Sequence, residues 1–220
     1  DPAEPVSIGA MVGPEAFMEV KVLQHATQLA ALDRIPEIAA EFEQAFGRRS
    51  GGLLRPYRTD DAETIVIALG SVMGTIEETV DELRGSGMAI GALGIGSFRP
   101  FPFDEVRSAL AGARRVVVLE KALALGVGGI VSENVRAALP TPAAALATVI
   151  AGLGGRPITQ ASLRTLFTDA AAGRLETLTF LDLDAGLVER ELRRTREQRR
   201  SGPHAENMLR DLGAVAHKAV

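Results

Sequence analysis

The chain has 220 residues, of which 46% are hydrophobic, so it can build the core of one large globular domain with extensions. Its formal net charge of -4 and its 4% of aromatic residues disfavour nucleic-acid binding. The absence of cysteine excludes disulfides, thiolate metal sites, iron-sulfur ligation and a cysteine nucleophile. The three histidines, His25, His204 and His217, lie far apart in sequence, which disfavours a histidine-based metal site or catalytic triad.

The sequence also indicates where in the cell the protein is located. No apolar run reaches the roughly 18 residues of a membrane span, and no signal peptide is present. Together with the lack of cysteine, this predicts a cytoplasmic protein that does not contact a membrane. The chain begins at Asp1 instead of methionine, so we expect upstream sequence to have been removed, by design or by proteolysis.

Residues 1–58 are predicted to be a lead-in followed by a helical extension. Prolines and glycines up to Gly13 predict an extended lead-in, and the pattern from Pro14 to Phe46 is helical. Pro36 interrupts that pattern, so we expect two helices, the first about 18 residues long by its periodicity. His25 is interpreted as a surface or packing residue of the first helix.

Residues 59–184 are predicted to form an α/β domain, because apolar strands alternate with helical patterns. The first strand, Thr64–Leu69, leads through a glycine turn into a helix for which Thr75 and Glu78 form a predicted capping box. The buried stripe of that helix is expected to be Ile76, Val80 and Leu83.

The strand and turn recur twice before residue 130. Met88–Ile95 leads into the turn Phe98–Pro102 and a second helix, and Val116–Glu120 leads into the turn Gly126–Gly129 and a third. Such alternation indicates right-handed βαβ units and a mostly parallel sheet.

A fourth apolar run, Ala144–Ala151, is followed by a helix with Thr159 as its expected N-cap. Leu175–Leu183 is expected to be an antiparallel edge strand. The fold class is therefore a mostly parallel open sheet of about five strands with one antiparallel edge strand and helices on both faces. The inward stripe of the last helix is expected to be Leu163, Leu166, Phe167 and Ala170.

Residues 185–220 are predicted to be a charged helix and a tail. Arginines and glutamates of mixed sign between residues 187 and 200 indicate a solvated or partner-facing helix. The tail after Gly202 carries Met208, Leu209 and Leu212, and both docking on a partner and disorder are open for it.

The candidate sites are three glycine turns at the carboxyl ends of the strands, where open α/β sheets bind ligands and helix N-termini attract anions. Glycine is needed for tight turns in any such sheet, so a purely structural role is the alternative. No turn matches a Walker A loop or a dinucleotide fingerprint, and no nucleophile has a credible base, so we expect no catalytic residue and no metal site. The candidates for anion binding or contacts between domains are Gly70, Ser71, Gly74, Arg99, Lys121, Gly128 and Gly129.

Several of these segments, taken in order, resemble one family. They are Leu69–Thr75, Val80–Arg84, Phe98–Pro102, Val117–Lys121, Gly126–Gly129, Glu133–Leu139 and Ile150–Arg156. Together they resemble the second domain of the alpha chain of pyruvate:ferredoxin oxidoreductase, which is similar to the transketolase carboxyl-terminal fold. The resemblance covers residues 1–184 and is strongest from 64 to 156; the arginine-rich helix and the tail depart from it.

The resemblance implies a non-catalytic assembly part of an enzyme that oxidatively decarboxylates a 2-oxoacid, expected to be pyruvate, to acyl-CoA. Electrons pass through iron-sulfur clusters to ferredoxin. Thiamine diphosphate, Mg and the clusters are expected on other parts of the enzyme and none on this segment. The implied partners are the preceding alpha-chain domain and the other subunits, with ferredoxin and coenzyme A meeting the full complex.

Two alternatives stay open on the residues. One is a stand-alone module that binds a small anion or phosphometabolite at the glycine turns. The other is the equivalent domain of a transketolase or of the first component of a 2-oxoacid dehydrogenase. Within the favoured interpretation, we hypothesise that the carboxyl edge of the sheet, with Arg99 and Lys121, meets other domains of the assembly.

Overall fold

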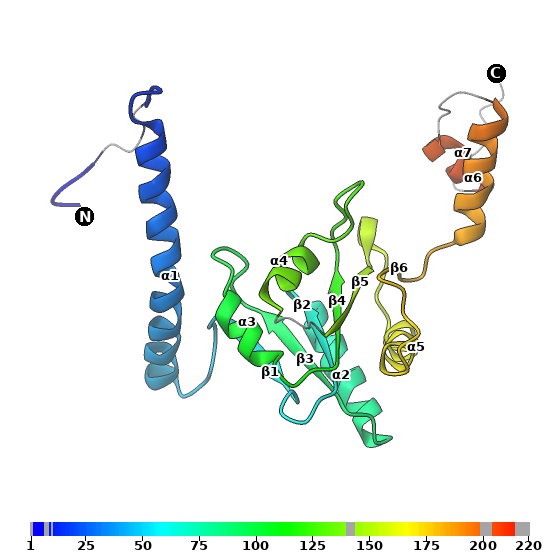
Figure 1. The fold of residues 1–220 in the computed structure, drawn as a ribbon, viewed down its shortest axis with the longest axis horizontal. Coiled ribbons are helices and arrows are strands. Elements are labelled where there is room, and N and C mark those ends of the chain that lie inside the picture. Colours follow the sequence, from blue (N-terminus) through cyan, green and yellow to red (C-terminus); the bar gives the residue numbers. More distant parts are fainter. Residues whose placement is uncertain (1, 7–8, 10, 140–143, 199–203, 214–220) are drawn as a thin grey trace. The chain divides into compact units, whose positions relative to one another are not determined.

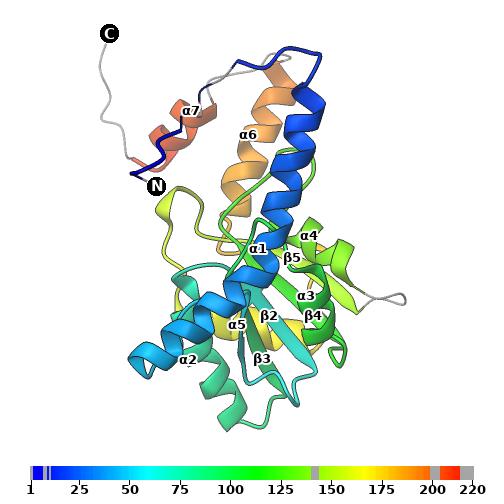
Figure 2. The ribbon, with the colours of Figure 1, turned by 90° about the vertical axis from the view of Figure 1, so that its left-hand side faces the viewer.

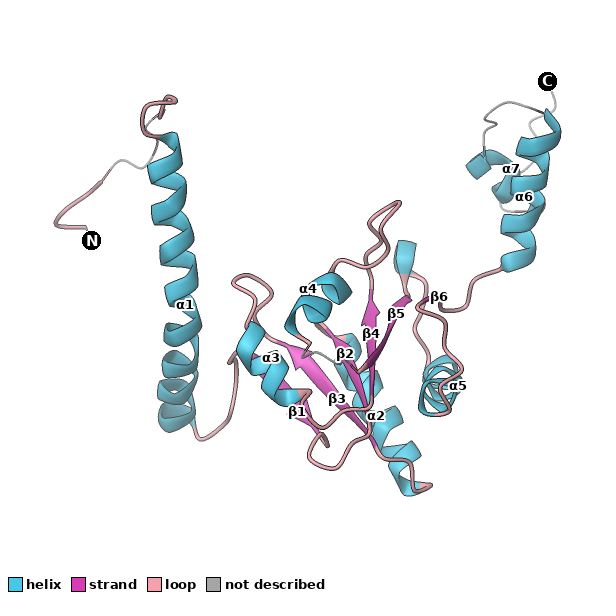
Figure 3. Ribbon diagram, in the orientation of Figure 1, coloured by secondary structure: helices cyan, strands magenta, loops and turns pink. Residues whose placement is uncertain are grey.

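The computed structural model describes residues 2–6, 9, 11–139, 144–198 and 204–213. It contains two compact units, Asp1–Leu181 and Asp182–Val220. The first unit holds a six-stranded sheet (Figures 1 and 3). Its strands are β1 (Leu54–Tyr57), β2 (Thr64–Ala68), β3 (Ile90–Ile95), β4 (Arg115–Glu120), β5 (Ala145–Ile150) and β6 (Leu178–Phe180).

The strand order is β1-β3-β2-β4-β5-β6, and every neighbouring pair is parallel except β1 with β3. This confirms the predicted class of a mostly parallel sheet with one antiparallel edge strand, with six strands instead of about five. The predicted place of the antiparallel strand is wrong. β6 pairs parallel with β5, because the helix before it returns the chain across the sheet, and Val149 lies opposite Thr179.

The antiparallel edge strand is β1, which the sequence pattern did not predict. Leu54 lies opposite Ile95 and Tyr57 opposite Ala92. An edge strand tolerates a proline, because one side of it needs no ladder hydrogen bonds, and Pro56 occupies such a place.

Helices cover both faces of the sheet (Figure 1). Helices α2 (Val72–Gly85) and α5 (Gln160–Ala171) pack on one face, and α3 (Phe103–Ala109) and α4 (Val131–Ala138) pack on the other. The predicted N-cap of α5 is confirmed, since the hydroxyl of Thr159 accepts the backbone N–H of Ser162 at 3.1 Å. The predicted buried stripes are confirmed for Ile76, Val80, Leu83, Leu163, Leu166, Phe167 and Ala170.

The predicted capping box of α2 is wrong. Gly70 adopts a left-handed φ of 76° directly after β2, so the helix starts at Val72 and Thr75 lies inside it. The carbonyl of Thr75 accepts the hydroxyl of Thr79 at 2.7 Å, and Glu78 accepts the side chain of Gln160 at 2.5 Å. Glu78 therefore ties α2 to α5 instead of closing a helix end.

The segment before the sheet is one helix, α1 (Phe17–Phe46), of 30 residues. The predicted division into two helices is wrong, because α1 continues through Pro36; Figure 2 shows it bending along its length. A proline removes one helical hydrogen bond and kinks a helix without always ending it. His25 is exposed on α1, in keeping with its interpretation as a surface residue, and the helix has no buried residue.

The second unit contains α6 (Ala185–Gln198) and α7 (His204–Asp211). The predicted charged helix is confirmed up to residue 198, and residues 199 and 200 lie outside the described part. The predicted tail forms α7 up to Asp211, and its last residues, 214–220, also lie outside the described part. Among the residues that the structure describes, no helix is both long and apolar enough to cross a membrane.

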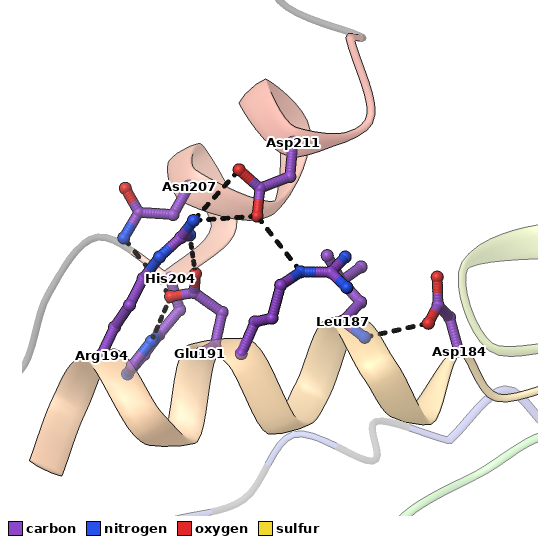
Figure 4. Close-up of polar contacts among 8 residues, drawn as sticks. Asp184, Leu187, Glu191, Arg194, His204, Asn207 and Asp211 are labelled. Carbon is purple, nitrogen blue, oxygen red and sulfur yellow. Dashed lines mark hydrogen bonds and ion pairs between the residues drawn. The ribbon is translucent and has the colours of Figure 1, made fainter.

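A buried carboxylate joins the two helices of this unit (Figure 4). Glu191 of α6 is 3% exposed and lies 3.2 Å from Nδ1 of His204 and 3.3 Å from Nδ2 of Asn207, and it also pairs with Arg194. Arg194 donates to both carboxylate oxygens of Asp211, at 3.0 and 3.2 Å. Burial raises the pKa of Glu191, but the hydrogen bonds from His204, Asn207 and Arg194 outweigh it and leave that pKa below its usual value.

Candidate functional site

The candidate residues follow strands whose carboxyl ends share one edge of the sheet. β2 connects to β3 through α2 on one face, whereas its neighbour β4 connects to β5 through α4 on the other face. The chain thus leaves β2 and β4 in opposite directions. Open α/β sheets bind ligands at such a switch point, outside the carboxyl ends of the strands.

The turn after β2 lies at this switch point. Gly70 and Ser71 are exposed there, and Ser71 occupies the N-cap position of α2 without a side-chain capping hydrogen bond. Gly74, also exposed, has open space where a Cβ would stand. The turn therefore leaves room for a group of another molecule to approach the start of α2.

The turn after β3 presents Arg99. Its guanidinium lies 4.1 Å from the centroid of the Phe98 ring and donates to the carbonyl of Phe98 at 2.6 Å. The peptide bond between Arg99 and Pro100 is cis. The side chain of Arg99 is exposed and makes no ion pair with a carboxylate in the described residues.

Lys121 presents a second cation at the same edge, after β4. Its side chain is exposed and runs beside Gly152, where a Cβ would come within 2.8 Å of the lysine Cε. No described carboxylate pairs with it. Because β2 lies between β3 and β4, the turn with Gly70 and Ser71 comes between Arg99 and Lys121 along the edge.

The turn before α4 is arranged around Glu120, a residue whose role the sequence pattern did not predict. Glu120 is 4% exposed, and its carboxylate accepts the backbone N–H groups of Ile130 at 2.7 Å, Val131 at 2.8 Å and Ser132 at 3.1 Å. It also accepts the Ser132 hydroxyl at 2.9 Å. An internal anion thus occupies the free N–H groups at the start of α4 and complements the helix dipole.

Gly128 and Gly129 make room for this carboxylate. Both are buried, and a Cβ on Gly129 would stand 2.0 Å from Oε1 of Glu120 and 2.1 Å from Oγ of Ser132. The N–H groups that follow these two glycines are bound to Glu120 in the folded chain. The sequence contains the parts of this arrangement, which are an acid after an apolar strand, a Gly-Gly pair and a helix start at Ile130 without a capping residue, but no motif that links them.

The described part of the chain offers no metal centre, since no group of three or more histidine or carboxylate side chains is placed to hold an ion. Of the histidines, His25 lies on α1 and His204 on α7, and His217 lies outside the described residues. In the described residues, the carboxyl edge thus carries two cations without a carboxylate partner, Arg99 and Lys121, and an open turn between them. The carboxylate of Glu120 at this edge is fully hydrogen-bonded to the start of α4.

Comparison with known proteins supports one family. Residues 62–163 match the family model of the pyruvate:ferredoxin oxidoreductase core domain II. The pyruvate synthase subunit PorA of Methanosarcina barkeri is 41% identical over 126 residues, which cover 57% of this chain and 31% of the relative. PorA of Thermotoga maritima is 39% identical over 181 residues, covering 80% of this chain and 45% of the relative.

One similar solved structure is a 2-oxoglutarate:ferredoxin oxidoreductase from Magnetococcus marinus with 2-oxoglutarate, coenzyme A and succinyl-CoA bound. Its sequence is 20% identical to this chain and its TM-score is 0.45, and the match covers 60% of this chain and 21% of that chain. The chain spans less than half the length of the PorA relatives. Residues 62–163 are therefore similar to the pyruvate:ferredoxin oxidoreductase core domain II, and the similarity to PorA supports a chain of the alpha type from that family.

Proposed function

We propose that this chain is the assembly part, without catalytic residues of its own, of the alpha chain of a thiamine-diphosphate-dependent 2-oxoacid:ferredoxin oxidoreductase. The 2-oxoacid is pyruvate, which the complete enzyme decarboxylates oxidatively to acetyl-CoA while electrons pass to ferredoxin. The observation that carries the proposal is the match of residues 62–163 to the core domain II, together with the similarity to PorA over up to 80% of this chain.

The geometry of the carboxyl edge supports the absence of catalysis in this part. Proton transfer needs an acid or base within hydrogen-bond reach of a substrate, most often an imidazole or a carboxylate. Glu120, the buried carboxylate of this edge in the described residues, is fully engaged by the backbone and the hydroxyl at the start of α4. It holds the fold and has no free face for a reactant.

The described residues contain no group of three or more histidine or carboxylate side chains placed to hold a metal ion. Following the family resemblance, the proposal assigns thiamine diphosphate, Mg and the iron-sulfur clusters to other parts of the enzyme. Its partners are the preceding alpha-chain domain and the other subunits. Ferredoxin and coenzyme A meet the complete assembly in the cytoplasm.

We assign the contact with these partners to the carboxyl edge. Arg99 and Lys121 are exposed cations without carboxylate partners in the described residues, and unpaired cations suit carboxylates on a facing surface. The open turn of Gly70, Ser71 and Gly74 lies between them. Gly128 and Gly129 contribute by shaping the neighbouring loop.

The test is charge reversal in the assembled enzyme. Arg99→Glu and Lys121→Glu are introduced into the full alpha chain, which is co-expressed with its other chains and purified without oxygen. We expect weaker recovery of the other chains and a proportional loss of pyruvate-dependent dye reduction. Arg114→Glu, an exposed position at the amino edge of the same sheet, is the matched control and should leave both unchanged. Normal assembly and activity of both edge variants would count against the proposal.

A further inference from the structure

The loop between β4 and α4 projects beyond the sheet (Figure 1). It closes on itself, since Ala124 and Gly128 exchange two backbone hydrogen bonds of 2.7 and 2.8 Å and Val127 donates to the carbonyl of Ala124 at 2.9 Å. Gly126 and Gly128 have φ values of 81° and 122°, which favour glycine. The tip of the loop is therefore a tight, internally bonded turn.

Both ends of the loop are fixed as well. It starts directly after Glu120, and its far end is held where the Glu120 carboxylate binds the backbone of Ile130 and Val131. Gly129 packs against that carboxylate so closely that no side chain fits. A loop anchored in this way loses little conformational freedom when it binds a partner.

The tip nevertheless carries apolar side chains in solvent. Leu125 is 88% exposed and Val127 is 68% exposed, and Ile130 at the base is also exposed. Lys121, at the other end of the loop, has no carboxylate partner in the described residues. The loop therefore presents a convex apolar tip with a cation at its base. The two cavities at the amino edge of the sheet are not lined by residues of this loop.

We propose that this loop, residues 121–130, is a preformed contact that inserts Leu125 and Val127 into an apolar pocket on another polypeptide of the assembly. The pocket is concave because the tip is convex, and its rim carries a carboxylate opposite Lys121. Glu120 is the positioning residue that presents the tip. The inference rests on the proposed function, for which it names the contact and the chemistry of the facing surface.

The test uses the full alpha chain with its other chains, purified without oxygen. Leu125→Asp and Val127→Asp place a charge on the tip, and Leu125→Met keeps it apolar at the same position. Since both side chains are exposed, the unfolding midpoint of the free chain should not change. Loss of an anchor of this kind typically weakens association about 30-fold, whereas Leu125→Met should stay within about threefold of wild type. Ala111→Asp, at an exposed position at the amino edge of the sheet, is the control for added charge.

The outcomes separate the two proposals. If the wild type assembles and both aspartate variants assemble equally well, the inference about the loop is overturned while the proposed function stands. If the wild type itself recruits no other chain, the proposed function is overturned, and the inference with it. Loss of assembly on Leu125→Asp and Val127→Asp, with assembly kept by Leu125→Met and Ala111→Asp, supports the loop contact.

Discussion

Replacing Glu120 by alanine should destabilise the first unit strongly, because one carboxylate satisfies four donors at the start of α4. The N–H groups of Val131 and Ser132 belong to buried residues, and each buried donor left without a partner costs about 1–3 kcal/mol. Ile130 is exposed, so water can replace its partner. With some water reaching the vacated space, the expected loss is about 3 kcal/mol.

Glu120→Gln keeps the shape of the side chain but turns one acceptor into a donor. The amide oxygen can still accept some of the hydrogen bonds from the start of α4, whereas the amide NH₂ faces N–H groups and cannot accept. We therefore expect the free energy of unfolding to fall by about 2 kcal/mol. Glu133→Gln, on the exposed side of the same helix, is the matched control and should stay within about 0.5 kcal/mol of wild type.

The assay is urea unfolding at pH 7, followed by far-ultraviolet circular dichroism because the chain has no tryptophan. The predicted result is a lower midpoint with an unchanged slope. A loss below about 1 kcal/mol for Glu120→Ala would refute the reasoning, because it would mean that the four hydrogen bonds add little beyond what water provides.

Three further predictions use the same unfolding assay or an acid titration. Gly129→Ala should lower the free energy of unfolding by about 2–4 kcal/mol, since its Cβ would stand 2.0 Å from the Glu120 carboxylate. Gly74→Ala is the control: it has open space around its Cβ, so the free energy of unfolding should stay the same or rise by up to about 1 kcal/mol. Equal effects at the two sites would contradict this prediction. Phe167→Ala should cost about 3–5 kcal/mol, since the ring is fully buried, and a change under about 1 kcal/mol would place the ring outside the core. Because the folded pKa of Glu191 is lowered, its contribution to the α6–α7 unit is present above the unfolded pKa of about 4.3 and is lost as pH falls through the lower folded pKa. As pH is lowered from 7, nuclear Overhauser contacts between α6 and α7 should therefore persist down to pH 5. Loss of these contacts already above pH 5 would contradict a lowered pKa of Glu191.

The central strands were predictable because a parallel strand covered on both faces is a continuous apolar run, as in Thr64–Leu69 and Val116–Glu120. The edges were not. Arg55 and Pro56 break the apolar pattern of β1, which pairs on one side only. The chain steps from β5 to β6 in the same direction as from β4 to β5, yet α5 and α4 lie on opposite faces, so the two connections have opposite hands. No local pattern encodes that difference.

The turns of the candidate site were predictable, but the interactions inside them were not. Apolar strands followed by glycines located the carboxyl edge and its cations, Arg99 and Lys121. The role of Glu120 depends on where α4 begins, and Ile130 gives no capping signal to mark that point. The missing cap is supplied by a residue ten positions earlier in the chain, through tertiary structure.

The most direct test of the proposed function is to tag the native protein that contains this sequence, purify it from its own cells without oxygen, and analyse what accompanies it. We expect a thiamine-diphosphate-bearing polypeptide and a cysteine-rich iron-sulfur polypeptide in stoichiometric amounts, with pyruvate-dependent reduction of a viologen dye by the purified complex. Recovery of the protein alone, without thiamine diphosphate, iron or dye reduction, would contradict the assignment to a 2-oxoacid:ferredoxin oxidoreductase.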